Sequence, residues 1–143
     1  MGVVEGITLV LNRDGDTRVV ESVVAEAGRG LEGDCHSNLT LISAEALEGL
    51  HQDTGIELSG EGSRRNVLTR GIDLNALVGR RFRVGSVEAV GVELAEPCTK
   101  LARLNGRNLR IIRGLVHRGG LRADVVAGGE IALGDPVEAD PGR

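Results

Sequence analysis

Glycine is the feature of this sequence that most constrains its fold. The 22 glycines divide the chain into short apolar runs, several of which alternate with polar residues. Alternation with a period of two is typical of β-strands, and glycines between such runs mark turns. Val3 to Leu11 and Thr17 to Val24 are therefore expected to form a hairpin around Asp14-Gly15-Asp16, since Asp-Gly suits a tight turn.

Short strands are expected along the rest of the chain, with a few helical segments between them. Ser43 is a good N-cap for a helix that runs to about Asp53. A helical turn is expected over Asp73 to Leu77, one or two short helices over Thr99 to Arg113, and a loop over Ser59-Gly60-Glu61-Gly62. The further strands are predicted at Leu39 to Ile42, Arg64 to Thr69, Arg80 to Val84, Val87 to Leu94, Leu121 to Val126, Glu130 to Leu133 and from Val137, with turns at Gly128-Gly129 and Gly134-Asp135-Pro136.

Many short strands, few helices and no alternation of strands with helices indicate a mainly β fold, a barrel or a sandwich. A closed barrel would also remove exposed strand edges. With 143 residues, the chain is expected to form a single domain, residues 1–143, with its own core.

Composition argues against two classes of partner. The net charge is −4 and Phe82 is the only aromatic residue, which disfavours nucleic-acid binding through phosphates or stacked bases. No apolar run approaches the about 20 residues that span a bilayer, and the first residues do not resemble a signal peptide. We therefore expect no membrane partner, a cytoplasmic location, and two cysteines that are thiols.

Cys98 is the main candidate for chemistry. It follows an alternating strand in the sequence Pro97-Cys98-Thr99, where a loop can present its side chain to solvent. A free thiol there could act as a nucleophile, ligate a soft metal or accept sulfur as a persulfide. The alternative is a small buried hydrophobic residue, as most free cysteines are.

Arg64-Arg65-Asn66 is a candidate anion site. In a strand, Arg64 and Asn66 would share one face and Arg65 would lie on the other. One arginine would then bind an anion while the other forms an ion pair, and Asn66 would orient a ligand through its amide. A solvated basic strand edge is the alternative.

Asp34 and His36 lie in the glycine-rich loop from Ala27 to His36 and are a candidate acid–base or orienting pair. Capping of the loop by their side chains is the alternative. Zinc is not expected from Cys35, His36, Cys98 and His117, because no spacing resembles a zinc site and the adjacent Cys35-His36 fit one poorly.

His117-Arg118-Gly119-Gly120 could line an anion pocket through backbone N–H groups and the guanidinium. Taken alone, this segment reads more simply as a turn between a helix and a strand.

In order along nearly the whole chain, these segments resemble the MOSC domain, the module named for the C-terminal region of molybdenum cofactor sulfurases. The segments that carry the resemblance are Gly30-Leu31-Glu32-Gly33-Asp34 with His36, Leu39-Thr40-Leu41-Ile42-Ser43 with Glu45, Arg64-Arg65-Asn66-Val67, Gly71-Ile72-Asp73-Leu74, Pro97-Cys98, Arg118-Gly119-Gly120, Gly129-Glu130-Ile131 and Gly134-Asp135.

The resemblance implies a mostly β fold built around a barrel, with Cys98 as the residue that carries sulfur or contacts molybdenum. It implies a sulfur carrier, or a molybdenum-pterin protein that reduces N-hydroxylated compounds. The residues implied to contact the anionic cofactor are Arg64, Arg65, Asn66, Pro97, Arg118 and Gly119. The expected partner is a cysteine desulfurase for a carrier or an electron-donor protein for a reductase.

Two features depart from the family pattern. Cys35 stands where many relatives have arginine, and we hypothesise that it resolves a Cys98 persulfide as a disulfide. The chain also lacks room for the sulfurase domain of larger relatives, and Lys100 is the only lysine. We therefore expect no pyridoxal phosphate. A non-catalytic module that binds an anionic ligand remains the alternative from another class, and the sequence does not indicate an oligomeric state.

Overall fold

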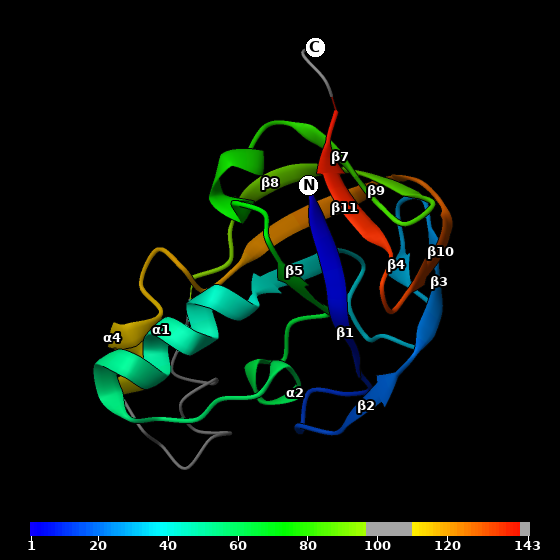
Figure 1. Ribbon diagram of the computed structural model, residues 1–143. Coiled ribbons are helices and arrows are strands. Elements are labelled where there is room, and N and C mark those ends of the chain that lie inside the picture. The colour runs from blue at the N-terminus through cyan, green and yellow to red at the C-terminus, as the bar shows by residue number, and fades with distance from the viewer. Residues whose placement is uncertain (97–109, 141–143) are drawn as a thin grey trace.

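A closed β-barrel forms the body of the protein in the computed structural model, which describes residues 1–96 and 110–140 (Figure 1). Its strands are β1 (Gly2–Val10), β5 (Leu39–Ser43), β6 (Val67–Arg70), β7 (Arg81–Val84), β8 (Val87–Leu94), β9 (Leu121–Ala127) and β11 (Pro136–Ala139). Their order is β11-β7-β8-β9-β5-β6-β1, and β1 pairs with β11 to close the barrel. The mainly β barrel expected from the sequence is thus confirmed.

The first hairpin is confirmed as well. β2 (Thr17–Val20) pairs antiparallel with β1, and the chain then continues into β3 (Ser22–Glu26). A second sheet has the order β10-β3-β4, with β4 at Gly30–Leu31 and β10 at Gly129–Ala132. Gly128-Gly129 is therefore not a hairpin turn, because β9 pairs inside the barrel while β10 pairs with β3.

The helix predicted after Ser43 is α1 (Ala44–Thr54). The Ser43 hydroxyl accepts a hydrogen bond from the N–H of Ala46 at 3.0 Å, and Gly55 ends the helix in the left-handed region with a φ of 76°. The helical turn expected from Asp73 is η1 (Leu74–Leu77), capped by the Asp73 side chain. α4 (Arg110–Gly114) is the described part of the predicted segment from Thr99 to Arg113.

Two further local expectations are wrong. The segment expected as a loop contains the short helix α2 (Gly60–Ser63), because the Ser59 hydroxyl caps it by accepting from the N–H of Gly62. β5 and β6 also pair in parallel, so the chain crosses over between them through α1. The fold therefore contains one strand–helix–strand connection that the glycine pattern did not reveal.

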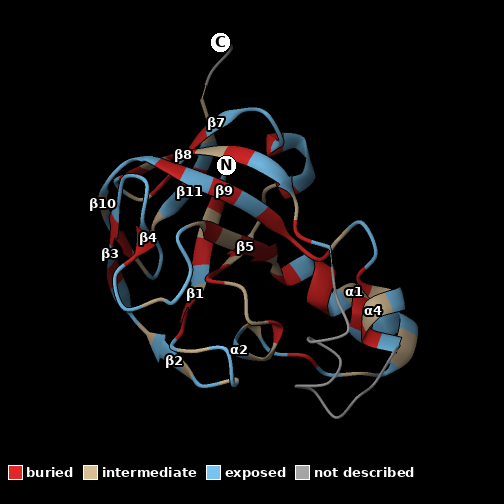
Figure 2. Ribbon diagram, turned by 180° about the vertical axis from the view of Figure 1, so that it is seen from behind, coloured by how far each residue is buried: buried red, intermediate tan, exposed pale blue. Residues whose placement is uncertain are grey.

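Two apolar clusters hold these elements together. The larger fills the barrel and includes Phe82, whose side chain is fully buried. The smaller lies between α1, α4 and the barrel and includes the buried Leu50 and Ile111. Figure 2 shows these buried residues along the barrel strands and on α1 and α4. Among the described residues, none of the helices combines the length and the apolar composition that a membrane-spanning helix needs.

Arg70 anchors α1 to the barrel. Its guanidinium donates to Glu48 of α1 at 2.6 Å and to Glu5 of β1 at 2.7 Å. The hydrogen bond from Arg70 holds the pKa of the Glu48 carboxyl below its usual range, and the same bond raises the pKa of Arg70. The ion pair thus favours one orientation of the helix on the sheet.

Gly120, directly before β9, lies where the chain approaches the backbone of β5 closely. Its φ is 115°, and a Cβ there would overlap the carbonyl oxygen of Leu41. Gly120→Ala is therefore expected to lower the free energy of unfolding by about 3 kcal/mol or more, measured by urea denaturation followed by circular dichroism. Gly134→Ala is the matched control, because Gly134 also has a positive φ, 85°, but open space around it. Its expected cost is about 1–2 kcal/mol, and equal costs at both positions would contradict the steric argument.

Candidate functional site

The register of the barrel strands brings several of the segments that carry predicted site residues together at one end of the barrel. Leu121, at the start of β9, pairs with Leu41 of β5 and with Leu94 at the end of β8. Leu41 also pairs with Val67, the first residue of β6. The segments before β6, after β8 and before β9 therefore lie together. Pro97 and Cys98 follow β8 closely and lie outside the described residues.

Arg65 joins the segments that adjoin β8 and β9. Its Nε donates to the carbonyl oxygen of Gly119 at 2.8 Å, and its Nη2 donates to that of Ala95 at 2.8 Å and of Glu96 at 3.5 Å. Hydrogen bonds from a charged guanidinium are stronger than those between neutral groups. Arg65 thus fixes the backbone of the last two described residues before Pro97.

His117 holds the side chain of Glu96. The backbone N–H of His117 donates to Oε1 at 2.8 Å, and its imidazole Nδ1 lies 3.1 Å from Oε2. The backbone of His117 is left-handed, with a φ of 61°, and its carbonyl accepts from the amide of Asn75 at 2.7 Å. Glu96 is thus fixed both by its carbonyl and by its carboxylate.

Asn66 is the buried polar centre of this end of the barrel. Its Oδ1 accepts from the N–H of Thr40 at 3.1 Å and from the hydroxyl at 3.2 Å. Its Nδ2 donates to the carbonyl of Thr8 at 3.0 Å and to Oδ1 of Asp34 at 2.9 Å. Every donor and acceptor of the amide is used, so Asn66 acts as a structural link between β1, β5 and the glycine-rich loop.

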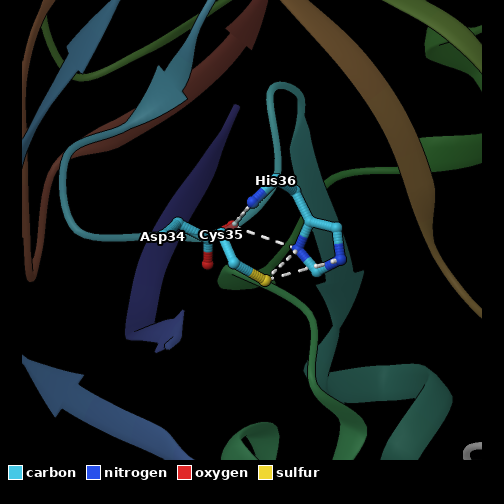
Figure 3. Close-up of side chains that lie close together, drawn as sticks. All are labelled: Asp34, Cys35 and His36. Atoms are coloured by element: carbon cyan, nitrogen blue, oxygen red, sulfur yellow. Dashed lines mark hydrogen bonds and ion pairs between the residues drawn. The ribbon is translucent and has the colours of Figure 1, made fainter. Parts of the chain in front are cut away.

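Asp34 and His36 lie together, as expected (Figure 3). The Asp34 side chain is fully buried and also accepts from the N–H of Val10 at 2.6 Å. Its Oδ2 accepts from the N–H of His36 at 3.0 Å and lies 3.2 Å from the imidazole Nδ1. Asp34 therefore caps the loop through backbone N–H groups and also orients the exposed imidazole of His36. Both interpretations of the sequence, loop capping and an orienting pair, describe this arrangement.

Arg64 does not lie in the strand predicted from Arg64 to Thr69. It ends α2 in the left-handed region with a φ of 61°, and β6 begins only at Val67. The expectation that Arg64 and Asn66 share a strand face is therefore wrong. Arg64 donates to the carbonyl of Asn12 at 3.3 Å and lines a hollow with the turn after β1.

Arg118 lies next to Gly119, the residue whose carbonyl Arg65 binds. Its Nη2 donates to Asp53 at 2.6 Å and its Nε to the carbonyl of Gly114. Arg118 lines a hollow of about 450 Å³ together with two carboxylates, Glu45 and Asp73. The structure thus brings Arg65, Asn66 and Gly119 together, while Arg64 lines a different hollow.

Sequence reasoning missed two residues that shape this site. Thr40 interrupts an apolar strand with a hydroxyl that pairs with Asn66, and this interruption was a usable signal. Glu96 directly precedes Pro97, but its partner lies 21 residues later. No local pattern indicates that pairing.

The amide of Asn66 can be tested directly. Asn66→Ala would leave the N–H of Thr40 and Oδ1 of Asp34 without this partner in a buried place, so we expect the free energy of unfolding to fall by about 2–4 kcal/mol. Asn75→Ala is the control, since Asn75 is exposed and donates to a carbonyl at 2.7 Å. We expect it to cost less than about 1 kcal/mol in the same urea titration. Similar losses for both variants would show that Asn66 is not a structural centre.

Comparison with solved structures finds the same fold in bacterial proteins. The YuaD protein from Bacillus subtilis superposes with a TM-score of 0.84 at 16% identity, covering 97% of this chain and 96% of that chain. YiiM from Geobacillus stearothermophilus gives a TM-score of 0.78 at 13% identity over 98% of this chain and 75% of that one. YiiM from Escherichia coli gives 0.73 at 18% identity over 99% and 71%. At these identities the likeness concerns the fold alone.

Comparison with the curated proteins finds no match. A model of the MOSC domain, however, matches residues 28–138, which include the glycine-rich loop, Asn66 and the segment through Gly119. The matched region contains every residue singled out above for the site. Because this match covers well over half of the sequence, the chain belongs to the MOSC domain family.

Proposed function

We propose that this protein serves molybdenum-cofactor sulfur metabolism by carrying sulfur as a persulfide on Cys98. The family membership supports an association with the molybdenum cofactor. The observation that carries the proposal is the double attachment of Glu96, through its carbonyl to Arg65 and through its carboxylate to His117. A cysteine that must meet a partner's sulfur gains from a fixed backbone beside it.

Covalent geometry limits how far Cys98 can lie from this attachment. Two residues span at most about 7 Å of extended chain, so the Cα of Cys98 lies within that distance of the Cα of Glu96. In the proposed mechanism, the Arg65 guanidinium, which binds the carbonyls of residues 95 and 96, would supply positive charge to the segment that carries the thiol. A nearby cation favours the thiolate, which is the form that reacts.

The chemistry needs a sulfur donor. The Cys98 thiolate would attack the terminal sulfur of a persulfide on a cysteine desulfurase. A new S–S bond forms on Cys98, the S–S bond of the donor breaks, and the donor thiol leaves. Asp34 and His36 are proposed to orient the glycine-rich loop during this encounter.

Resident molybdenum-pterin, as in a reductase of N-hydroxylated compounds, fits the described residues less well. That cofactor is a phosphorylated anion, but Arg118 is paired with Asp53 and shares its hollow with Glu45 and Asp73. Arg64 lines a separate hollow. Arg64 and Arg118 thus do not converge on one phosphate-sized site, which favours a carrier.

The first experiment separates these functions. Protein purified anaerobically from a cofactor-producing host is incubated with a cysteine desulfurase and cysteine, and its intact mass and molybdenum content are measured. We expect the wild type and Cys35→Ser to gain one sulfur atom and Cys98→Ser to gain none. Stoichiometric molybdenum that disappears in Cys98→Ala would favour the reductase instead. Neither metal nor sulfur on the wild type would favour a non-catalytic binding module.

The role of Arg65 gives a second prediction. Arg65→Met removes the hydrogen bonds to residues 95, 96 and 119, so we expect sulfur loading of Cys98 to slow about tenfold or more. Arg64→Met is a matched control at the neighbouring position, and it should load at the wild-type rate. Circular dichroism would confirm that both variants fold. Equal rates for Arg65→Met and the wild type would contradict the proposed role of this attachment.

A further inference from the structure

Asp34, Cys35 and His36 point three different metal-binding groups toward one another (Figure 3). The Cys35 sulfur lies 3.6 Å from Nδ1 of His36, and Oδ2 of Asp34 lies 3.2 Å from the same nitrogen. One ligand atom from each residue lies within 4.8 Å of the others. We propose that these three residues bind a divalent metal ion of the zinc type.

Two of the three ligand separations, both measured from Nδ1 of His36, are close to those in a tetrahedral zinc site. Zn–S bonds of about 2.3 Å and Zn–N bonds of about 2.05 Å, at the tetrahedral angle, separate sulfur and nitrogen by about 3.6 Å. With a Zn–O bond of about 2.1 Å, oxygen and nitrogen lie about 3.4 Å apart. The separations of 3.6 and 3.2 Å at His36 are thus close to those required. The sulfur also lies 3.9 Å from Nε2, so the exposed imidazole must turn for Nδ1 to face the ion.

The protein holds the carboxylate in place before any ion arrives. Oδ1 of Asp34 accepts from Val10 and Asn66, which leaves Oδ2 directed at His36. Hydrogen bonds of this kind to a ligand orient it and strengthen metal binding. The Asn66 amide would thus support the metal as well as the barrel.

Exposure favours entry of an ion. The Asp34 side chain is fully buried, whereas 55% of the His36 side chain is exposed and Cys35 is exposed. A buried carboxylate beneath an exposed thiol and imidazole leaves a fourth position open to water, as in zinc sites with three protein ligands. The mixture of sulfur, nitrogen and oxygen also suits zinc better than magnesium or calcium.

This inference revises the expectation that the adjacent Cys35 and His36 fit zinc poorly. The N–H of Cys35 donates to the carbonyl of Val10 at 2.8 Å and the N–H of His36 to Asp34. These bonds fix a tight bend that turns both side chains to the same side (Figure 3). Consecutive residues can therefore face one ion, which spacing in the sequence does not reveal.

Cobalt(II) is the probe for the test. Chelator-treated, reduced protein is titrated anaerobically with Co²⁺ and then with Zn²⁺ as a competitor. We expect one ion per chain and a thiolate-to-cobalt charge-transfer band that Zn²⁺ abolishes. Because ligands must be deprotonated to bind, affinity should fall as the pH is lowered.

Two variants test proposed ligands, and two serve as controls. Cys35→Ser should abolish the band, and His36→Gln should weaken binding about 100-fold or more, since loss of an outer-shell contact alone costs about 10–100-fold. Cys98→Ser tests the other thiol, and His117→Gln tests another exposed histidine that lies beside a carboxylate. Both should bind like the wild type. Cys35 and His36 are exposed, so their variants should fold, which circular dichroism would check.

Binding only at millimolar ion, a band that persists in Cys35→Ser, or a band lost in Cys98→Ser would each overturn the proposal. None of these outcomes depends on the proposed carrier function. Sulfur loading of Cys98 is measured separately, without added metal, so either proposal can fail while the other stands.

Discussion

The buried amide of Asn66 is the interaction on which this end of the barrel depends. It links the backbone of β1 and β5 to the carboxylate of Asp34 through hydrogen bonds of 2.9–3.2 Å. A buried amide is costly unless each of its groups is paired. The observed arrangement of the three elements satisfies the donors and acceptors of Asn66, so the amide stabilises their relative positions. Arg65, directly before Asn66, links the segment after β8 to the segment before β9 through hydrogen bonds to their backbone carbonyls.

The polar residues of this end thus have two kinds of task. The side chains of Asn66 and Arg65 form hydrogen bonds with backbone groups and, for Asn66, with a buried carboxylate. These bonds stabilise the scaffold. Cys35 and His36 remain exposed and available to solvent. This division places an exposed thiol and an exposed imidazole beside a buried hydrogen-bond network.

Much of the fold could be predicted from the sequence because alternation and turn glycines are local signals. The hairpin of β1 and β2, the caps of α1 and the pair of β7 and β8 follow from such signals. The parallel pairing of β5 with β6 could not, because it depends on how α1 packs on the barrel. The predicted strand wrongly included Arg64, because Ser59 caps a short helix that the left-handed backbone of Arg64 ends. Among the site residues, the pairing of Glu96 with His117 links positions that no local pattern connects.

Closure of the barrel also determines when the protein can acquire its structure. Val3 of β1 pairs with Pro136 of β11, so the strand made early must wait for one made more than a hundred residues later. Contacts between such distant parts of a chain slow folding, because the loop between them must be closed first. During synthesis, residues 7–10 of β1 can pair with β2 as soon as β2 is made, whereas Gly2 and Val3 have no partner on that edge until β11 follows. An unpaired strand edge can pair with strands of other chains, so the last strand of the barrel also protects the first from aggregation.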